Sequence, residues 1–177
     1  MSEPTNSHDS SSPLAEPGSV ARARGDVKPI PESSMKWIKP IMRFMSKANV
    51  FVYEATDGKV WGKFPGGAPV CLVTMTGAKS GKKRTIPLIY LPHGDDVIIV
   101  ASQGGMAKHP VWYWNLKKNP HVEIQDGARK RRMLARQVGD EEKKALWPHI
   151  LTIYPDFEDY QARTDRNIPM FVCSPEG

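Results

Sequence analysis

Residues 70–102 read VCLVTMTGAKSGKKRTIPLIYLPHGDDVIIVAS, and this stretch decides the fold class. Three runs within it, at residues 70–75, 84–91 and 97–102, are rich in Val, Ile, Leu and Thr, and they match the pattern of buried strands. The short connections between these runs contain Gly, Lys, His and Asp, which favour turns. The stretch therefore predicts three consecutive strands joined by hairpin turns.

The segments on either side extend this pattern. Apolar residues at helical spacing predict a helix over residues 35–52 and a shorter one that begins near Pro110. The remaining predicted elements are strands over 121–125 and 129–138 around an Asp126–Gly127 turn, a helix over 141–153 capped by Asp140 and kinked at Pro148, a short helix over 156–162 and a closing strand over 168–173. This order predicts a mainly β protein with flanking helices, namely a small antiparallel barrel with helices on its outside.

Composition points to one domain with a tail. The chain has 177 residues, of which 40% are hydrophobic. The first 34 residues contain eight Ser, five Pro and no aromatic residue, which predicts a disordered tail over residues 1–33 and a single domain over 34–177. No apolar run is long enough to span a bilayer, and no apolar segment of a secretory signal follows the first Met. We therefore expect a cytoplasmic protein.

Cysteine content and charge narrow the function class. Cys71 and Cys173 both lie among apolar neighbours, which predicts buried free thiols and excludes a disulfide framework or a Cys-rich zinc site. A single bridge between them stays open, although a reducing compartment is the simpler interpretation. The net charge is +6, and because the first 34 residues hold three basic and five acidic residues, the remainder of the chain carries +8. A basic domain favours anionic ligands such as phosphates, acidic cofactors, nucleic acid or lipid.

The connection TGAKSGKKR at residues 76–84 carries the most concentrated charge. It is not a P-loop, because only three residues separate Gly77 from Gly81 and Lys83 stands where that motif needs Ser or Thr. Four cations on one glycine-containing turn suit a phosphate or a carboxylate tail. The alternative is a solvated basic hairpin tip.

Three further motifs suggest a pocket for planar molecules. Residues 101–105, ASQGG, follow a strand, and their glycines allow a flat ligand to approach the backbone. The three aromatic residues at 112–114 cannot all face one core, and the aromatic residues at 154, 157 and 160 share one helical face. For each motif, ordinary packing or a plain loop is the alternative.

Basic residues elsewhere allow two interpretations each. On the helix over 35–52, four cations share one face, which suits either packing on its own domain or an anionic membrane surface: Lys36, Lys39, Arg43 and Lys47. Along residues 129–136, five Arg or Lys residues could contact nucleic acid, but no nucleic-acid-binding motif accompanies them. A solvated sheet edge protected by charge is the better interpretation, and we expect no nucleic-acid partner.

Hydrolase and metalloenzyme motifs are missing. The five histidines show no metal-ligand spacing, no Gly-x-Ser-x-Gly elbow occurs, and no pair of carboxylates stands in a plausible site. A basic, aromatic-lined pocket without a nucleophile suits a protein whose cofactor supplies the chemistry.

Three segments resemble a known family: LVTMTGAKSGKKRTIPLIY, VIIVASQGGMAKHPVWYWNLKKNPHVEI and WPHILTIYPDFEDYQARTDRNIPMFVC. In this order they look like the deazaflavin-dependent nitroreductase and quinone reductase family of mycobacteria and related actinobacteria. The resemblance runs from about Trp37 to the C-terminus. It implies a split antiparallel β-barrel, similar to that of FMN-binding oxidases, that binds reduced coenzyme F-420 and passes a hydride to a quinone or nitro-aromatic acceptor.

The resemblance also assigns roles to residues by position. Lys79 and Arg84 would hold the phosphate and polyglutamate tail of the cofactor. The other implied cofactor contacts are Pro87, Leu88, Ile89, Val100, Ala101, Ser102, Gln103, Gly104, Gly105, Pro110, Trp112, Tyr113 and Asn115. Ile89, Tyr154, Phe157 and Tyr160 would bind the acceptor, and the implied catalytic residues are Ser102, Tyr154 and Tyr160.

The sequence departs from the family pattern at four positions. Ile89 and Phe157 stand where Tyr is found, Gln103 replaces a Lys, and Ala78 replaces an Arg. The acceptor wall is therefore less polar, which suits a quinone better than a nitroimidazole prodrug. Lys82 and Lys83 could compensate at the cofactor tail.

Three alternatives stay open from the sequence. One is an enzyme of the same fold that uses FMN, since the cation cluster suits either phosphate. The others are a non-catalytic deazaflavin-binding protein and a module that associates peripherally with the inner face of the cell membrane. The oligomeric state is not predicted.

Overall fold

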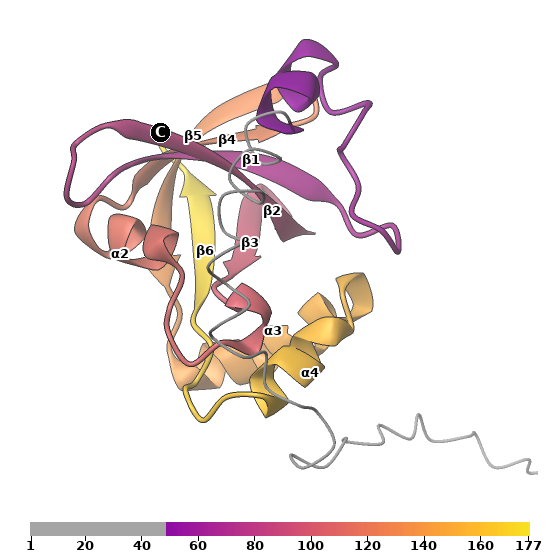
Figure 1. Cartoon of the computed structure of the whole chain (residues 1–177), viewed down its shortest axis with the longest axis vertical. Helices are drawn as coiled ribbons and strands as arrows, with labels where there is room; N and C mark the ends of the chain where they lie inside the picture. The colour runs from indigo at the N-terminus through magenta and orange to yellow at the C-terminus, as the bar shows by residue number, and fades with distance from the viewer. Residues whose placement is uncertain (1–48) are drawn as a thin grey trace, which may run out of the picture.

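The computed structural model describes residues 49–177, and Figure 1 shows their arrangement. A helix covers residues 49–55 in this part of the chain. The strands are β1 (Val70–Thr76), β2 (Lys83–His93), β3 (Asp96–Val100), β4 (His121–Asp126), β5 (Arg129–Gln137) and β6 (Met170–Pro175). The helices are the 3-10 turn η2 (Gln103–Gly105), α2 (Val111–Lys118), α3 (Asp140–Ile153) and α4 (Asp156–Ala162).

The six strands form a closed barrel in the order β1-β2-β3-β6-β5-β4, and every neighbouring pair is antiparallel. Closure arises because β6, at the end of the chain, inserts between β3 and β5. The predicted antiparallel barrel with outer helices is confirmed.

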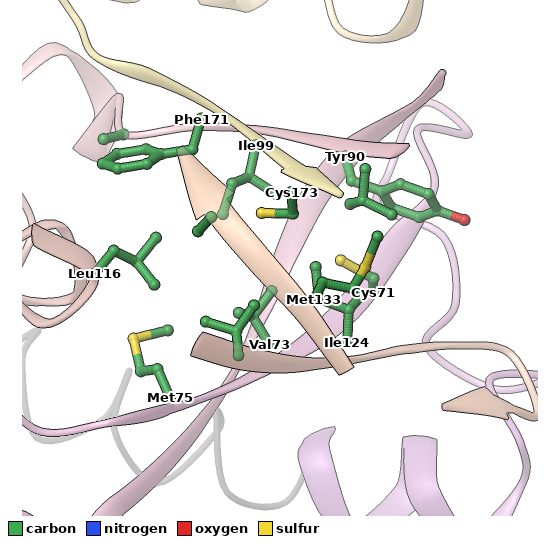
Figure 2. Close-up of a cluster of buried hydrophobic side chains, with 14 of the residues drawn as sticks. Cys71, Val73, Met75, Tyr90, Ile99, Leu116, Ile124, Met133, Phe171 and Cys173 are labelled. Atoms are coloured by element: carbon green, nitrogen blue, oxygen red, sulfur yellow. The ribbon is translucent and has the colours of Figure 1, made fainter. Parts of the chain in front are cut away.

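Alternation along each strand separates the barrel interior from an outer layer. On β3, Val97 and Ile99 point into the interior cluster, whereas Ile98 and Val100 belong to the outer one. The interior cluster includes apolar side chains of all six strands, together with Leu116 of α2 (Figure 2). The barrel is therefore filled by side chains rather than hollow.

Both cysteines lie in this interior, as Figure 2 shows. They are free and fully buried, which confirms the prediction of buried thiols. Burial raises the pKa of the Cys173 thiol to about 12, and it raises that of Cys71 further. Because the thiolate is the reactive form, these thiols are inert in the folded protein.

The outer faces of β3 and β6 are covered by α3 and α4. Ile150 of α3 and Phe157 of α4 pack with Ile98, Met170 and other outward-facing side chains. In Figure 1 these two helices lie across one end of the barrel, away from the helix at residues 49–55.

Two tyrosines fix the β4–β5 turn. The Tyr53 hydroxyl donates to the carbonyl of Val70 at 2.9 Å and accepts from the N–H of Gly127 at 3.0 Å. The Tyr90 hydroxyl donates to Asp126 Oδ1 at 2.5 Å. Because Tyr53 belongs to the helix at residues 49–55, these bonds attach that helix to β1 and to the β4–β5 turn.

Some predicted boundaries were wrong. Asp126 pairs with Arg129, so the hairpin turn is formed by residues 127–128 rather than by Asp126–Gly127. Gly139 is the N-cap of α3, and Asp140 lies in its first turn instead of capping it. Pro148 lies inside the helix, as predicted. Basic strand β5 is not a sheet edge, because β4 and β6 pair with its two sides. Its exposed cations therefore cover the outside of a closed barrel.

The predicted tail over 1–33 and most of the predicted helix over 35–52 lie outside the described residues. Within residues 49–177, no helix combines the length and the apolar character needed to cross a membrane.

Candidate active site

Strand β2 has different neighbours along its two halves. Residues 83–89 pair with β1, whereas pairing with β3 begins only at Tyr90, opposite Ile99. On its other side β3 pairs with β6 from Val97 to Val100, and just beyond it the Ala101 N–H donates to the carbonyl of Pro169 at 2.8 Å. In the described part of the chain, the first half of β2 thus has a strand on one side only. Pro87 suits such an edge because it has no N–H to donate.

The segment that leaves β3 folds into a tight turn. Gln103, Gly104 and Gly105 have φ angles of 49°, 65° and 78°, three successive residues in the left-handed region. A side chain at Gly104 would meet no atom within 4 Å, whereas a Cβ at Gly105 would lie 2.5 Å from the carbonyl oxygen of Tyr160. The turn is therefore open on one side and packed tightly against α4 on the other.

An aromatic wall stands next to this turn. Tyr154, Phe157 and Tyr160 contact one another with ring centroids 5.0 to 6.1 Å apart, and Phe64 meets the edge of Tyr154 at 5.5 Å. The hydroxyls of Tyr154 and Tyr160 are hydrogen-bonded at 3.0 Å. Burial, followed by this hydrogen bond, raises the pKa of Tyr154 above its ordinary value. Tyr154 therefore keeps its proton at neutral pH and is a hydrogen-bond donor.

The basic β1–β2 turn is held by α2. Asn115, which is buried, accepts a hydrogen bond from the Ala78 N–H at 2.9 Å, and Lys118 Nζ donates to the Ala78 carbonyl at 2.9 Å. The four cations on or beside this turn, Lys79, Lys82, Lys83 and Arg84, are all exposed. The turn thus presents positive charge from a fixed backbone.

Two buried polar atoms beside the turn that follows β3 have no hydrogen-bond partner among residues 49–177. They are Oε1 of Gln103, an acceptor, and Nε of Arg163, a donor. Arg163 also lies over the Tyr160 ring, 5.4 Å from its centroid, and its Cβ approaches Gly105. Leaving such atoms unsatisfied is costly, so these residues fit a bound planar group that carries both donors and acceptors.

The structure gives the predicted site residues different places. Ile89 lies on the outer face of β2, in contact with the cluster that holds the aromatic wall. Ala101 and Tyr113 instead belong to the buried interior cluster, and half-buried Leu88 packs against it. Trp112 is half-buried, 6.0 Å from Phe171, while Pro110 is buried directly before α2.

Two cavities occur away from these residues. One of about 400 Å³ lies beside β1 and β4, and one of about 620 Å³ lies between α3 and α4. Lys83 lines the first cavity, and none of the implied cofactor contacts, acceptor-binding or catalytic residues lines either one.

Three residues near the site were missed by sequence reasoning. Phe64 lies in a Gly- and Pro-rich connection, and Arg163 and Arg166 follow α4. No local pattern marks these residues, because their contacts depend on chain segments far away in sequence.

A closed antiparallel barrel with a polar turn and an aromatic wall suits a protein whose bound cofactor supplies the chemistry. Comparison with known proteins identifies the family. Residues 45–175 match the model of the F-420H(2)-dependent quinone reductase family, and the chain belongs to this family.

The chain is 39% identical over 126 residues to an F-420H(2)-dependent quinone reductase of Mycobacterium tuberculosis, covering 70% of this chain and 85% of that protein. A solved F-420H(2)-dependent reductase is 44% identical, with a TM-score of 0.57 over 60% of this chain and 94% of its own. A second structure, described as a domain-swapped dimer, is 36% identical with a TM-score of 0.59, covering 80% of this chain and 99% of its own.

Family membership confirms the resemblance seen in the sequence. The protein is an oxidoreductase that depends on reduced coenzyme F-420. FMN, the alternative cofactor, is correspondingly less favoured.

The two glycines of the β3 turn give a matched test of its packing. Gly105→Ala would place a methyl group against the backbone of α4, whereas Gly104→Ala would point into open space. Both variants carry the cost of a left-handed alanine, about 1–2 kcal/mol. We expect urea denaturation to show a clearly larger loss of the free energy of unfolding in Gly105→Ala than in Gly104→Ala. Equal losses would contradict the tight contact between the turn and α4.

Proposed function

We propose that this protein reduces a quinone with coenzyme F-420 bound along the first half of β2, between the β1–β2 turn and the aromatic wall. The observation that carries the proposal is that residues 83–89 of β2 pair with β1 but, in the described part of the chain, have no strand on their other side, since pairing with β3 begins only at Tyr90. When bound, the reduced deazaflavin supplies a hydride, and the quinone takes this hydride and a proton to become a hydroquinone.

The cofactor tail would be held electrostatically. Lys79 and Arg84 lie on or next to the turn that Asn115 and Lys118 hold, so their charges reach a phosphate and carboxylates without moving the backbone. Lys82 and Lys83 add charge at the same place. Charge-assisted hydrogen bonds of this kind are the stronger ones.

The planar ring would be held by the β3 turn. Gln103 offers an acceptor and Arg163 a donor, and neither atom has a hydrogen-bond partner in the described part of the chain. Gly104 leaves room for close approach of a flat ring. These groups fix the orientation of the ring, and orientation is what a hydride transfer between two bound molecules requires.

The acceptor would lie against Ile89, Tyr154, Phe157 and Tyr160. The Tyr154–Tyr160 hydroxyl pair offers a proton to the quinone oxygen as negative charge develops there. Ser102, at the start of the turn, adds a second hydroxyl. Ile89 and Phe157 keep the remaining wall apolar, which favours a quinone over a nitro-aromatic acceptor.

Cofactor binding is the first test. Oxidised coenzyme F-420 should bind the purified protein in a fluorescence titration at least about tenfold more tightly than FMN, and the reduced form should then reduce a soluble quinone. Preference for FMN would keep the fold and overturn the proposed donor. Binding of neither would favour a non-catalytic function.

The role of Ser102 can be tested separately. Ser102→Ala should lower kcat at least about tenfold, because removal of one hydrogen-bond donor to a developing oxyanion costs that much or more. The Kd for coenzyme F-420 should change far less. Thr152→Ala, which removes a hydroxyl on α3 that donates to the His149 carbonyl at 2.7 Å, is the control. An unchanged kcat in Ser102→Ala would exclude this residue from the mechanism.

An exposed apolar surface favours peripheral contact with a membrane as a second proposal. Phe51, Trp61 and Phe64 are 73%, 50% and 42% exposed, and Lys59 and Lys63 flank Trp61. Trp61 also has a φ of 67°, a rare conformation for a bulky residue. Aromatic rings beside lysines suit the interface of an anionic bilayer. Because Phe64 contacts Tyr154, this surface adjoins the acceptor wall.

Two exposed tryptophans provide a matched test of this surface. Trp61→Ser should weaken binding to vesicles of anionic and zwitterionic phospholipid by about tenfold, since burial of one large apolar side chain contributes at least about 1.5 kcal/mol. Trp114→Ser, on α2, removes a ring that is 56% exposed and should leave binding unchanged. Equal effects of the two variants, or no vesicle binding by the unmodified protein, would rule out this surface.

A further inference from the structure

The side chain of Arg166 contacts the turn that follows β3 and donates hydrogen bonds to main-chain carbonyls at both ends of that turn. Nη2 donates to the carbonyls of Ala101 and Ser102 at 3.1 and 2.6 Å, and Nε donates to the carbonyl of Met106 at 2.8 Å. These three carbonyls flank the left-handed residues 103–105. One guanidinium therefore joins the beginning of the turn to its end.

In the described part of the chain, this guanidinium bonds to main-chain carbonyls rather than to a carboxylate. Burial lowers its pKa below the ordinary value, although arginine stays charged at any physiological pH. A partly buried cation without an acidic partner needs strong hydrogen bonds, and the planar fork of arginine supplies several in a fixed geometry. Lysine offers a single point of charge and could not bond to all three carbonyls in this way.

Arg166 also connects the turn to α2. Its Nη1 lies 3.3 Å from Nδ1 of His109, and the His109 ring stacks on Tyr113 at 4.2 Å. Burial, and then the nearby Arg166 charge, lower the pKa of His109. Neutral His109 can accept a hydrogen bond from the guanidinium, so the contact extends from the turn to the start of α2.

The turn itself needs such support. Successive left-handed residues are strained when one of them is not glycine, and Gln103 is the non-glycine residue here. Within the turn, the Gly105 N–H donates to the Ser102 carbonyl at 3.0 Å, while the Met106 N–H lies 3.3 Å from the Gln103 carbonyl. Arg166 shares the Ser102 carbonyl, so it fixes the same atoms that close the turn.

We propose that Arg166 is a positioning residue that holds the turn at residues 102–105 in the conformation that binds the cofactor ring. The proposal rests on the function proposed above, because it assigns that turn to coenzyme F-420. It differs from a purely structural role, in which packing of Gly105 on α4 would fix the turn and Arg166 would add only stability.

Arg166→Lys is the decisive variant, since it keeps the charge and removes the fork. We expect the Kd for oxidised coenzyme F-420 to rise at least about tenfold, because the loss of one hydrogen bond to a charged group accounts for that factor. Arg136→Lys is the matched control. Arg136 forms a comparable two-point pair with Glu142, at 2.7 and 2.8 Å, on an exposed surface of β5. The Kd of Arg136→Lys for oxidised coenzyme F-420 should equal that of the unmodified protein.

Amide hydrogen exchange of the cofactor-free protein gives an independent measurement. In Arg166→Lys, exchange of the Gly105 and Met106 amides should accelerate at least about tenfold while the amides of β4 keep their protection. A lower melting temperature with unchanged Kd and unchanged exchange at the turn would overturn the proposal. Failure of the unmodified protein to bind coenzyme F-420 would instead overturn the proposed function, and exchange would still report whether Arg166 holds the turn.

Discussion

Main-chain pairing of strand β2 is the constraint on which the rest of the structure depends. Its second half closes the barrel through β3, and its first half leaves one edge without a strand in the described part of the chain. A closed sheet has no edge to offer, so the separation of β2 from β3 creates a place where main-chain groups, a polar turn and outer helices meet. The fold is stabilised by closure, and the site exists because closure stops at Tyr90 and Ile99.

The elements around this edge come from distant parts of the chain. The β1–β2 turn brings the cations, the segment after β3 brings the left-handed turn, and the end of α3 together with α4 brings the aromatic wall. Asn115 and Arg166 fix the two turns mainly through hydrogen bonds to main-chain groups. Fixed backbone positions suit a rigid planar cofactor, because the site does not have to be reorganised when the ring binds.

Much of the fold could be predicted from the sequence, because alternation along 70–102 and the Gly-containing turns are local signals. The aromatic spacing of Tyr154, Phe157 and Tyr160 was equally local, and the structure places these residues in one cluster. The roles of Asn115 and Arg166 were not accessible in the same way. Asn115 contacts Ala78, and Arg166 contacts Ala101, across separations that only the folded barrel brings together. The exact turn at residues 127–128 was also missed, since the hydrogen bond from the Tyr90 hydroxyl holds Asp126 at the end of β4.

The two faces of strand β2 contribute to different parts of the structure. Leu88 contributes to the barrel interior, while its neighbour Ile89 contributes to the outer surface beside the aromatic wall. An insertion or deletion of one residue in this strand would exchange the two faces and would damage core and site together. A point substitution at an outward position leaves the interior untouched. The fold therefore tolerates a change of side chain at an outward position of β2 more readily than a change in the length of this strand.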